Sequence, residues 1–297
     1  MWQRIKPYLM ILPSLVVMGI LFMGGLAEGF LESLGLTSFH GVSQFTFKYY
    51  ERVLKDVDFW KSLFLTFRIA VLSTGIATAV AMILLFFLFL VRFGKHSFMA
   101  TYIQRVFQIP MLFPYLVSGY LIFTLFTQSG WFSRLVFHMG FIEEIEQFPI
   151  LVNDSFGWGI IMAYVWKTAP FIVLMLYPVI MKVKFSWIEA GKVLGANKGQ
   201  FFIQVVIPLM LSPMKLASFI VFSFTFLAFE IPYLLGVTYP KTLSVYSYQL
   251  YMSGNLLDRP QALAVNIFAI IITGFIGLGV YFVIGIKGAL GRGDGHE

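Results

Sequence analysis

Six long apolar stretches, separated by shorter polar segments, dominate the pattern of the chain. They cover residues 8–27, 62–91, 106–127, 156–181, 209–235 and 262–286. An α-helix rises about 1.5 Å per residue, so each stretch is long enough to cross a hydrocarbon core of roughly 30 Å. Because backbone polar groups in lipid must be satisfied within their own segment, we predict an all-α integral membrane protein. Its six transmembrane helices form one domain, residues 1–297.

Composition supports the same class. Hydrophobic residues make up 59% of the 297 positions and charged residues 12%, against roughly 25% charged in soluble proteins. The formal net charge of +7 comes from scattered Lys and Arg without a basic patch, so we expect no binding to nucleic acid. The first stretch follows Arg4 and Lys6, as in a secretory signal peptide, but the cleavage-like sequence at 25–27 is weak. We expect a retained first transmembrane helix instead.

Lys and Arg also predict the orientation, because cytoplasmic loops carry an excess of both. With the N-terminus in the cytoplasm, the larger group is cytoplasmic: Arg4, Lys6, Arg92, Lys95, Arg105, Lys182, Lys184, Lys192, Lys198, Lys287 and Arg292. The smaller group is external: Lys48, Arg52, Lys55, Lys61, Arg134, Lys241 and Arg259. We therefore expect both termini, and the polar segment 187–208, to lie in the cytoplasm.

The external segments differ in character. Apolar residues from Phe47 to Val57 recur at helical spacing among charged ones, which predicts a short amphipathic helix at the membrane surface. Segment 128–155 mixes aromatic and acidic residues, so contact with a soluble partner and a plain solvated loop both stay open. Segment 236–261 carries several tyrosines, and we expect them to anchor at the bilayer interface.

The sequence contains no enzyme motif. A Gly-x4-Gly-Lys-Ser/Thr loop is absent, so the chain cannot hold ATP phosphates in the usual way. The four histidines match no metal-ligand spacing, and the lack of Cys excludes thiol-based metal or redox sites. We predict a chain with no catalytic residue, no metal and no cofactor of its own.

Three ionisable residues within the apolar stretches are candidates for a solute pathway. Arg68, Lys167 and Glu230 lie roughly 9, 17 and 8 Å from the outer ends of their stretches at ~1.5 Å per residue. A charge near the bilayer centre costs at least ~2.5 kcal/mol, so each must face a partner or water. One interpretation is a polar cavity that binds solute. The other is an ion pair between Glu230 and Arg68 or Lys167 that holds helices together.

Prolines within the stretches predict helix breaks that leave backbone carbonyls free. They are Pro110, Pro114, Pro170, Pro178 and Pro232. In a membrane, freed carbonyls are tolerated where they face protein or water. Thr225, Phe226, Phe229 and Tyr233 share a predicted helix with Glu230, and either line a pathway or pack against other helices.

The polar segment 187–208 has an internal pattern of its own. Glu189 and Ala190 favour a helix, and an acidic residue suits a first turn. Gly195 then breaks the helix or takes a left-handed turn. From Phe201 onward, apolar residues at helical spacing lead back toward the bilayer.

This pattern resembles the EAA loop of binding-protein-dependent ABC importer permeases, which is Glu-Ala-Ala, three residues, Gly, nine residues and Ile-x-Leu-Pro. Four positions match at full spacing: Glu189, Ala190, Gly195 and Pro208. Three more keep small or aliphatic character: Gly191, Val205 and Ile207. Stretches 166–171, 229–236 and 258–264 resemble permeases of the polyamine, iron and sulfate importer branch.

The resemblance implies a type I importer permease subunit in a bacterial plasma membrane. Its ATPase-coupling residues would be Glu189, Ala190, Gly191, Gly195, Ala196 and Pro208. The implied partners are a second permease, identical or homologous, two cytoplasmic ATPases that hold ATP and Mg, and an external solute-binding protein. The implied solute is small and polar, such as a polyamine.

The alternative is an ion-coupled secondary transporter or channel that works alone. Lys167 and Glu230 would then serve the coupling. Matched half-chain repeats would favour this class, and none is visible in the sequence.

Overall fold

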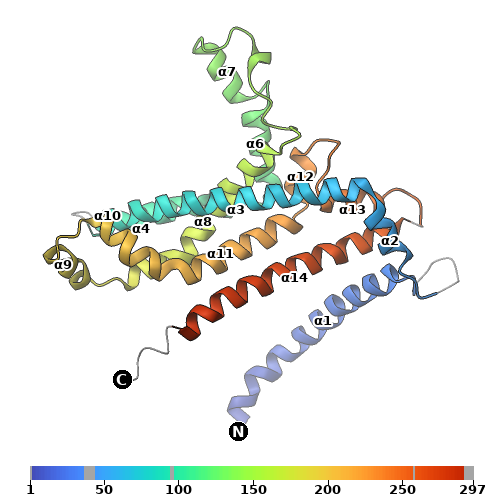
Figure 1. The fold of residues 1–297 in the computed structure, drawn as a ribbon, viewed down its shortest axis with the longest axis horizontal. Coiled ribbons are helices and arrows are strands. Elements are labelled where there is room, and N and C mark those ends of the chain that lie inside the picture. Colours follow the sequence, from blue (N-terminus) through green and yellow to red (C-terminus); the bar gives the residue numbers. More distant parts are fainter. Residues whose placement is uncertain (1, 37–43, 94–96, 257, 291–297) are drawn as a thin grey trace. The chain divides into compact units, whose positions relative to one another are not determined.

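The computed structural model describes residues 2–36, 44–93, 97–256 and 258–290 (Figure 1). Every regular element in these ranges is helical, as predicted: α1 (Trp2–Ser33), α2 (Lys48–Lys55), α3 (Val57–Arg92), α4 (Ser97–Phe107), α5 (Ile109–Leu112), α6 (Tyr115–Phe126), α7 (Trp131–His138), η1 (Ile145–Gln147), α8 (Trp158–Lys182), α9 (Phe185–Val193), α10 (Lys198–Phe201), η2 (Phe202–Val206), α11 (Ile207–Leu227), α12 (Glu230–Leu235), α13 (Leu243–Tyr251) and α14 (Arg259–Leu290). The two chain ends, which we predict to be cytoplasmic, lie outside these ranges. Lys95 and Arg292, which enter the prediction of orientation, also lie outside them.

Five helices in the described ranges are long and apolar enough to cross a bilayer. They are Met10–Ser33, Val57–Arg92, Trp158–Lys182, Lys198–Leu227 and Arg259–Phe282. A bent pair, Tyr102–Leu112 with Tyr115–His138, supplies a sixth span if it counts as one. The predicted number of spans is therefore confirmed, with one of them broken.

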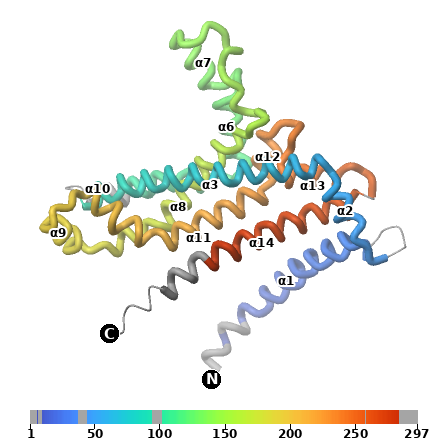
Figure 2. Tube along the Cα trace, in the orientation of Figure 1, coloured from blue at the N-terminus to red at the C-terminus, as the bar shows by residue number. Residues whose placement is uncertain are grey.

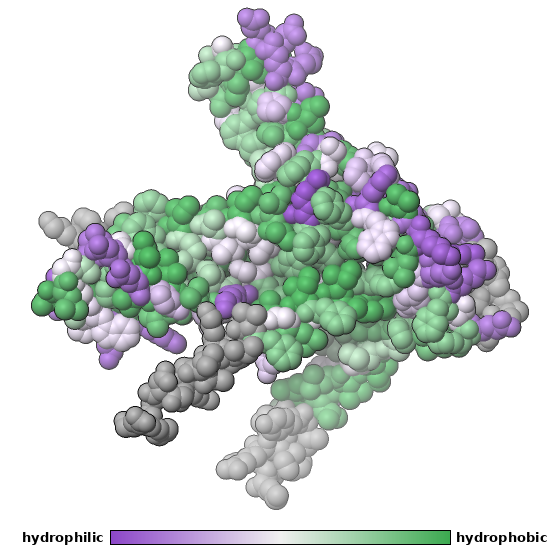
Figure 3. Space-filling model, viewed as in Figure 1, coloured by the Kyte–Doolittle hydropathy of each residue, from purple (hydrophilic) through white to green (hydrophobic). Residues whose placement is uncertain are grey.

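The chain divides into two compact units, residues 1–61 with 243–271 and residues 62–242 with 272–297. In the larger unit, α3, α8 and α11 run alongside one another, and α9 and α10 lie at one end of them (Figure 2). Fully buried alanines, among them Ala77, Ala81 and Ala217, allow the helix backbones to approach closely. Hydrophobic residues cover much of the flank of these helices, while hydrophilic and hydrophobic residues are mixed at the end that carries α9 (Figure 3).

The third predicted helix, 106–127, is not continuous. It breaks at Phe113 and Pro114, where the two halves of the bent pair meet at 95°. The pyrrolidine ring disfavours the helical region for the residue before a proline, and Phe113 is extended with ψ 139°. Pro114 therefore sets the position of the break.

The prediction of a single helix over 209–235 is wrong at its C-terminal end. α11 stops at Leu227, Ala228 is extended with ψ 146°, and α12 begins at Glu230. Pro232 has no N–H with which to bond the carbonyl of Ala228, which favours a break at this point. Thr225 and Phe226 consequently do not share a helix with Glu230.

Two other prolines do not break their helix. Pro170 and Pro178 both lie inside α8, which continues from Trp158 to Lys182, so the breaks predicted there are wrong. Two thirds of the most apolar 18-residue part of α8 is buried, which shows that neighbouring helices pack against most of its length. This packing offsets the lost backbone hydrogen bonds.

The smaller unit contains α1, α2, α13 and the start of α14. The short helix predicted after Phe47 is confirmed as α2, which ends before Asp56. Tyr246 of α13 is buried and donates a hydrogen bond to the carboxylate of Asp56. Tyr246 therefore packs inside the unit. For this tyrosine, the prediction that the segment 236–261 anchors at the bilayer interface is wrong.

Candidate functional site

The predicted coupling residues lie in a helix–turn–helix segment. α9 carries Glu189 and Ala190, both exposed. Because α9 begins at Phe185, Glu189 lies in the second turn, and the expectation of an acidic residue in the first turn is wrong. Its carboxylate is therefore too far from the helix start to gain from the helix dipole, which acts within the first turn.

Gly195 ends α9 in the left-handed conformation, with φ +82°. Its N–H donates to the carbonyl of Lys192 at 2.9 Å, and the N–H of Ala196 donates to the carbonyl of Gly191 at 2.9 Å. This pair of bonds defines a Schellman motif, which favours glycine at this position because it lacks Cβ. The predicted left-handed turn is confirmed.

Asn197 then starts α10 with a reciprocal cap. Its side chain accepts from the N–H of Gln200 at 2.8 Å, and the Gln200 side chain accepts from the N–H of Asn197 at 2.9 Å. A π-helical turn follows from Phe202 to Val206, in which the N–H of Ile207 donates to the carbonyl of Phe202. This wider turn directly precedes Pro208, whose ring would clash with the carbonyl four residues earlier in an α-helix.

The inner side of this segment is fixed to α3 by aromatic rings. Phe201 stacks on Phe89 with ring centres 6.2 Å apart, and Phe202 lies 5.4 Å from the same ring. The outer side is open: Val193 and Leu194 are 88% and 86% exposed. The loop thus presents two apolar side chains on a rigidly held turn.

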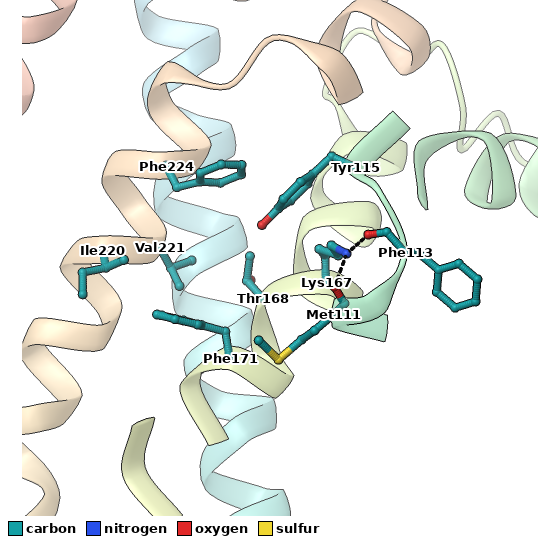
Figure 4. A pocket seen from close by; sticks show the side chains of 9 residues that line it. All are labelled: Met111, Phe113, Tyr115, Lys167, Thr168, Phe171, Ile220, Val221 and Phe224. Atoms are coloured by element: carbon teal, nitrogen blue, oxygen red, sulfur yellow. Dashed lines mark hydrogen bonds between the residues drawn. The ribbon is translucent and has the colours of Figure 1, made fainter. Parts of the chain in front are cut away.

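A cavity of about 260 Å³ lies beside the break between α5 and α6 (Figure 4). Its lining comes from α5, α6, α8, α11 and the break between α5 and α6: Met111, Phe113, Tyr115, Lys167, Thr168, Phe171, Ile220, Val221 and Phe224. Lys167 is only 5% exposed. Its ammonium donates to the carbonyls of Pro110 at 2.8 Å, Met111 at 3.2 Å and Phe113. A cation therefore satisfies the carbonyls released at the broken span.

Aromatic rings form much of the remaining wall. The Lys167 ammonium lies 4.9 Å from the centre of the Tyr115 ring, and that ring lies 4.5 Å from the ring of Phe224. The Tyr115 side chain points across the cavity toward α11 (Figure 4). No carboxylate is among the described residues that line the cavity. A cationic solute would therefore meet no counter-charge from the side chains described there.

The other charged candidates lie outside this cavity. Arg68 donates to the carbonyls of Ser155 and Phe156, each at 2.9 Å, and its guanidinium lies 4.3 Å above the Phe156 ring. Glu230 is exposed and is the first residue of α12, where its charge suits the helix N-terminus. Within the described residues, Glu230 pairs with neither Arg68 nor Lys167, so the predicted ion pair is not formed.

The uncharged candidates are used mainly for packing. Thr225 is buried, and its hydroxyl donates to the carbonyl of Val221 in its own helix at 2.9 Å. Phe229 stacks on Tyr233 with ring centres 4.9 Å apart. Of the predicted pathway residues, only Lys167 lines the cavity.

Sequence reasoning missed Tyr115, Thr168, Phe171 and Phe224 as lining residues. The signal for their position was the proline pair at 110 and 114, which we had connected with free carbonyls but not with Lys167. Groups of His, Cys, Asp and Glu able to hold a metal ion are absent from the described part of the chain.

Comparison with known proteins gives one consistent answer. Residues 89–287 match the family model described as binding-protein-dependent transport system inner membrane component. The chain is 25% identical over 277 residues to the probable starch degradation products transport system permease protein AmyD of Thermoanaerobacterium thermosulfurigenes, covering 91% of this chain and 89% of that protein. It is 24% identical over 169 residues to the sulfate transport system permease protein CysT of Escherichia coli, covering 57% of this chain and 51% of that protein.

The fold agrees with these relatives. A bacterial ABC transporter involved in the import of the acidic polysaccharide alginate contains a chain that superimposes with a TM-score of 0.78 at 18% identity. The match covers 95% of this chain and 97% of that chain. Because the family model spans most of the sequence, including the cavity and the Glu189 segment, the chain belongs to the binding-protein-dependent transport system inner membrane component family and is a permease subunit of an ABC importer.

Proposed function

We propose that the chain forms half of a solute pathway and that its segment 187–208 docks on a separate cytoplasmic ATPase subunit. The observation that carries this proposal is the exposure of Val193 and Leu194, 88% and 86%, at the tip of the segment. Apolar side chains exposed together on a polar loop are typical of a contact surface. Glu189 and Ala190, exposed on the same helix, extend the surface.

A rigid loop supports a coupling role. The left-handed turn at Gly195 fixes the tip, and Phe201 joins the segment to Phe89 in the core of α3. A displacement of the tip by an ATPase therefore passes to the membrane helices instead of being absorbed by the loop. An ion-coupled mechanism has less support, since Lys167 is engaged by carbonyls and Glu230 is exposed.

The partners follow from this role. A second permease, identical or homologous, completes the pathway, and an external binding protein delivers the solute. The ATPase partner binds ATP and Mg, since the sequence of this chain has no phosphate-binding loop. The proposed location is a bacterial plasma membrane with both termini and the segment 187–208 in the cytoplasm, as the Lys and Arg distribution predicts.

Co-purification tests the docking surface. The permease is co-expressed with its ATPase, and the double variant Val193→Asp/Leu194→Asp is expected to lose the ATPase while remaining in the membrane. Phe141→Asp is the matched control, because Phe141 is 78% exposed but lies outside the segment. Retention of the ATPase by the double variant would overturn the proposed docking site.

For the solute, we propose a neutral or acidic saccharide in place of the polyamine that the sequence resemblance implied. The cavity combines the rings of Tyr115, Phe171 and Phe224 with a lysine and a threonine, and carries no carboxylate to bind a polycation. AmyD, which matches 91% of this chain, is named for starch degradation products, whereas the sulfate relative CysT matches 57% of it.

The assembled complex distinguishes the two solutes. With its binding protein present, ATP hydrolysis is expected to rise with an oligosaccharide and not with spermidine. Stimulation by spermidine alone would overturn the saccharide assignment and leave the docking proposal untouched.

A further inference from the structure

A second cavity, of about 520 Å³, lies in the larger unit between α3, α11 and the second half of α14. Its lining is mainly apolar and includes one basic residue: Thr74, Met214, Lys215, Ser218, Phe219, Phe222, Ile276, Gly279 and Val280. Ser218 lines this cavity and Ile220 lines the first one. Residues two apart in an α-helix, such as Ser218 and Ile220, point in directions about 200° apart. The two cavities therefore lie on opposite faces of α11. The second cavity is therefore separate from the proposed solute pathway.

Lys215 is the charged group among the described residues that line this cavity. It lies eight residues after the start of α11 at Ile207, or about 12 Å along the helix, and it is half-buried. Among the residues that the structure describes, Lys215 has neither a hydrogen bond nor an ion pair, in contrast to Lys167. A lysine at such a depth requires a counter-charge or reaches toward the interface.

A hydroxyl group also lines the cavity. Thr74 is 9% exposed, and its Oγ1 lacks a hydrogen-bond partner in the described part of the chain. The Ser218 hydroxyl is already engaged, 3.0 Å from the hydroxyl of Thr78 on α3. A buried hydroxyl without a partner is costly. Because Thr74 lies at the midpoint of α3, it borders the deep apolar part of the cavity, and the anionic oxygen is needed at Lys215.

We propose that this cavity binds an anionic phospholipid, with its phosphate at Lys215 and an acyl chain along the apolar wall. The carboxylate of a neighbouring chain would neutralise Lys215 but would leave most of the volume beside Phe219 and Ile276 empty. An acyl chain fills that apolar space and is available in the surrounding bilayer. Basic pockets between transmembrane helices are a known setting for anionic head groups.

Native mass spectrometry of the purified full chain tests the charge. The chain is incubated with equal amounts of phosphatidylglycerol and phosphatidylcholine, and retained lipid is counted. We expect preferential retention of phosphatidylglycerol, roughly fivefold reduced in Lys215→Met, since one lysine contributes about that factor at a membrane surface. Lys215→Arg is expected to keep the preference. Lys182→Met is the matched control, because Lys182 is an exposed lysine in the last turn of α8.

A second pair of variants tests the space without touching the charge. A Cβ added at Gly279 meets open space, so Gly279→Leu fills the cavity and is expected to lower phosphatidylglycerol retention with normal folding. Gly274→Leu is the control, since Gly274 is equally open but does not line the cavity. Millimolar inorganic phosphate should leave the bound lipid in place. Equal retention of both lipids, unchanged binding by Lys215→Met, or displacement by phosphate would each overturn the proposal.

Discussion

The ring of Phe201 lies directly against the backbone of Gly191, so that a Cβ atom added to Gly191 would come within 2.9 Å of Phe201 Cδ2. Phe201 cannot easily move away, because it is buried and stacks on Phe89. Glycine, which stands where the family pattern has its second alanine, fits this contact because it lacks Cβ. The helix α9 and the return helix α10 are thereby held closer together than a methyl group allows.

Gly191→Ala is expected to destabilise the chain by about 1–3 kcal/mol, because the added methyl overpacks the contact with Phe201. Thermal unfolding of the purified protein measures the loss. Gly199→Ala is the control in the same segment, where the added Cβ meets Asn197 Oδ1 at an acceptable 3.4 Å. A second change, Phe201→Leu, should restore part of the stability to Gly191→Ala; equal melting temperatures for all variants would contradict the close contact.

Gly195→Val is expected to abolish ATP-driven transport while the protein still inserts into the membrane. The added side chain meets open space, so the effect comes only from φ +82°, which costs a residue with Cβ roughly 1–2 kcal/mol. Gly195→Asn should retain transport, because asparagine tolerates the left-handed region. The assay is solute uptake by the assembled complex, and normal uptake by the valine variant would show that the turn is unimportant.

Lys167→Met is expected to lower the thermal stability of the chain. It leaves the carbonyls of Pro110, Met111 and Phe113 without their donor, and a buried unsatisfied group costs about 1–3 kcal/mol. Lys182→Met removes an exposed lysine of the same helix and should unfold at the wild-type temperature. If Lys167→Met is as stable as the wild type yet inactive, the lysine serves the solute instead of the broken span.

Glu230→Gln is expected to leave stability within about 0.5 kcal/mol of the wild type, since the carboxylate is exposed and pairs with neither Arg68 nor Lys167. We expect reduced transport or altered solute-stimulated ATP hydrolysis in the complex. Unfolding and uptake are measured on the same preparation. Wild-type values in both would remove Glu230 from the functional and the structural account alike.

Sequence alone predicted the elements that depend on local chemistry. The apolar stretches predicted the spans, and the helix propensity of Glu189 together with Gly195 predicted a helix followed by a left-handed turn. Pro114 and Pro232 predicted breaks correctly, whereas Pro170 did not, because the burial of α8 against its neighbours overrides the local cost of proline.

The site depended on contacts between distant residues, which spacing does not reveal. Lys167 and the carbonyl of Pro110 are 57 positions apart, and their hydrogen bond decides that this lysine is a structural donor. From the sequence, one interpretation paired Lys167 with Glu230, because Glu230 is the acidic residue within the predicted spans.

The π-helical turn from Phe202 to Val206 contains one residue more than an α-helical turn of the same length would. Each residue in a helix turns its successors by about 100°, so this extra residue sets the rotational phase between α10 and α11. Deleting a single residue within the turn would convert it to an α-helix and rotate the proposed docking surface at Val193 and Leu194 away from its present direction. Segment length here is therefore as constrained as side-chain identity, and point substitutions alone would underestimate how strictly this junction is specified.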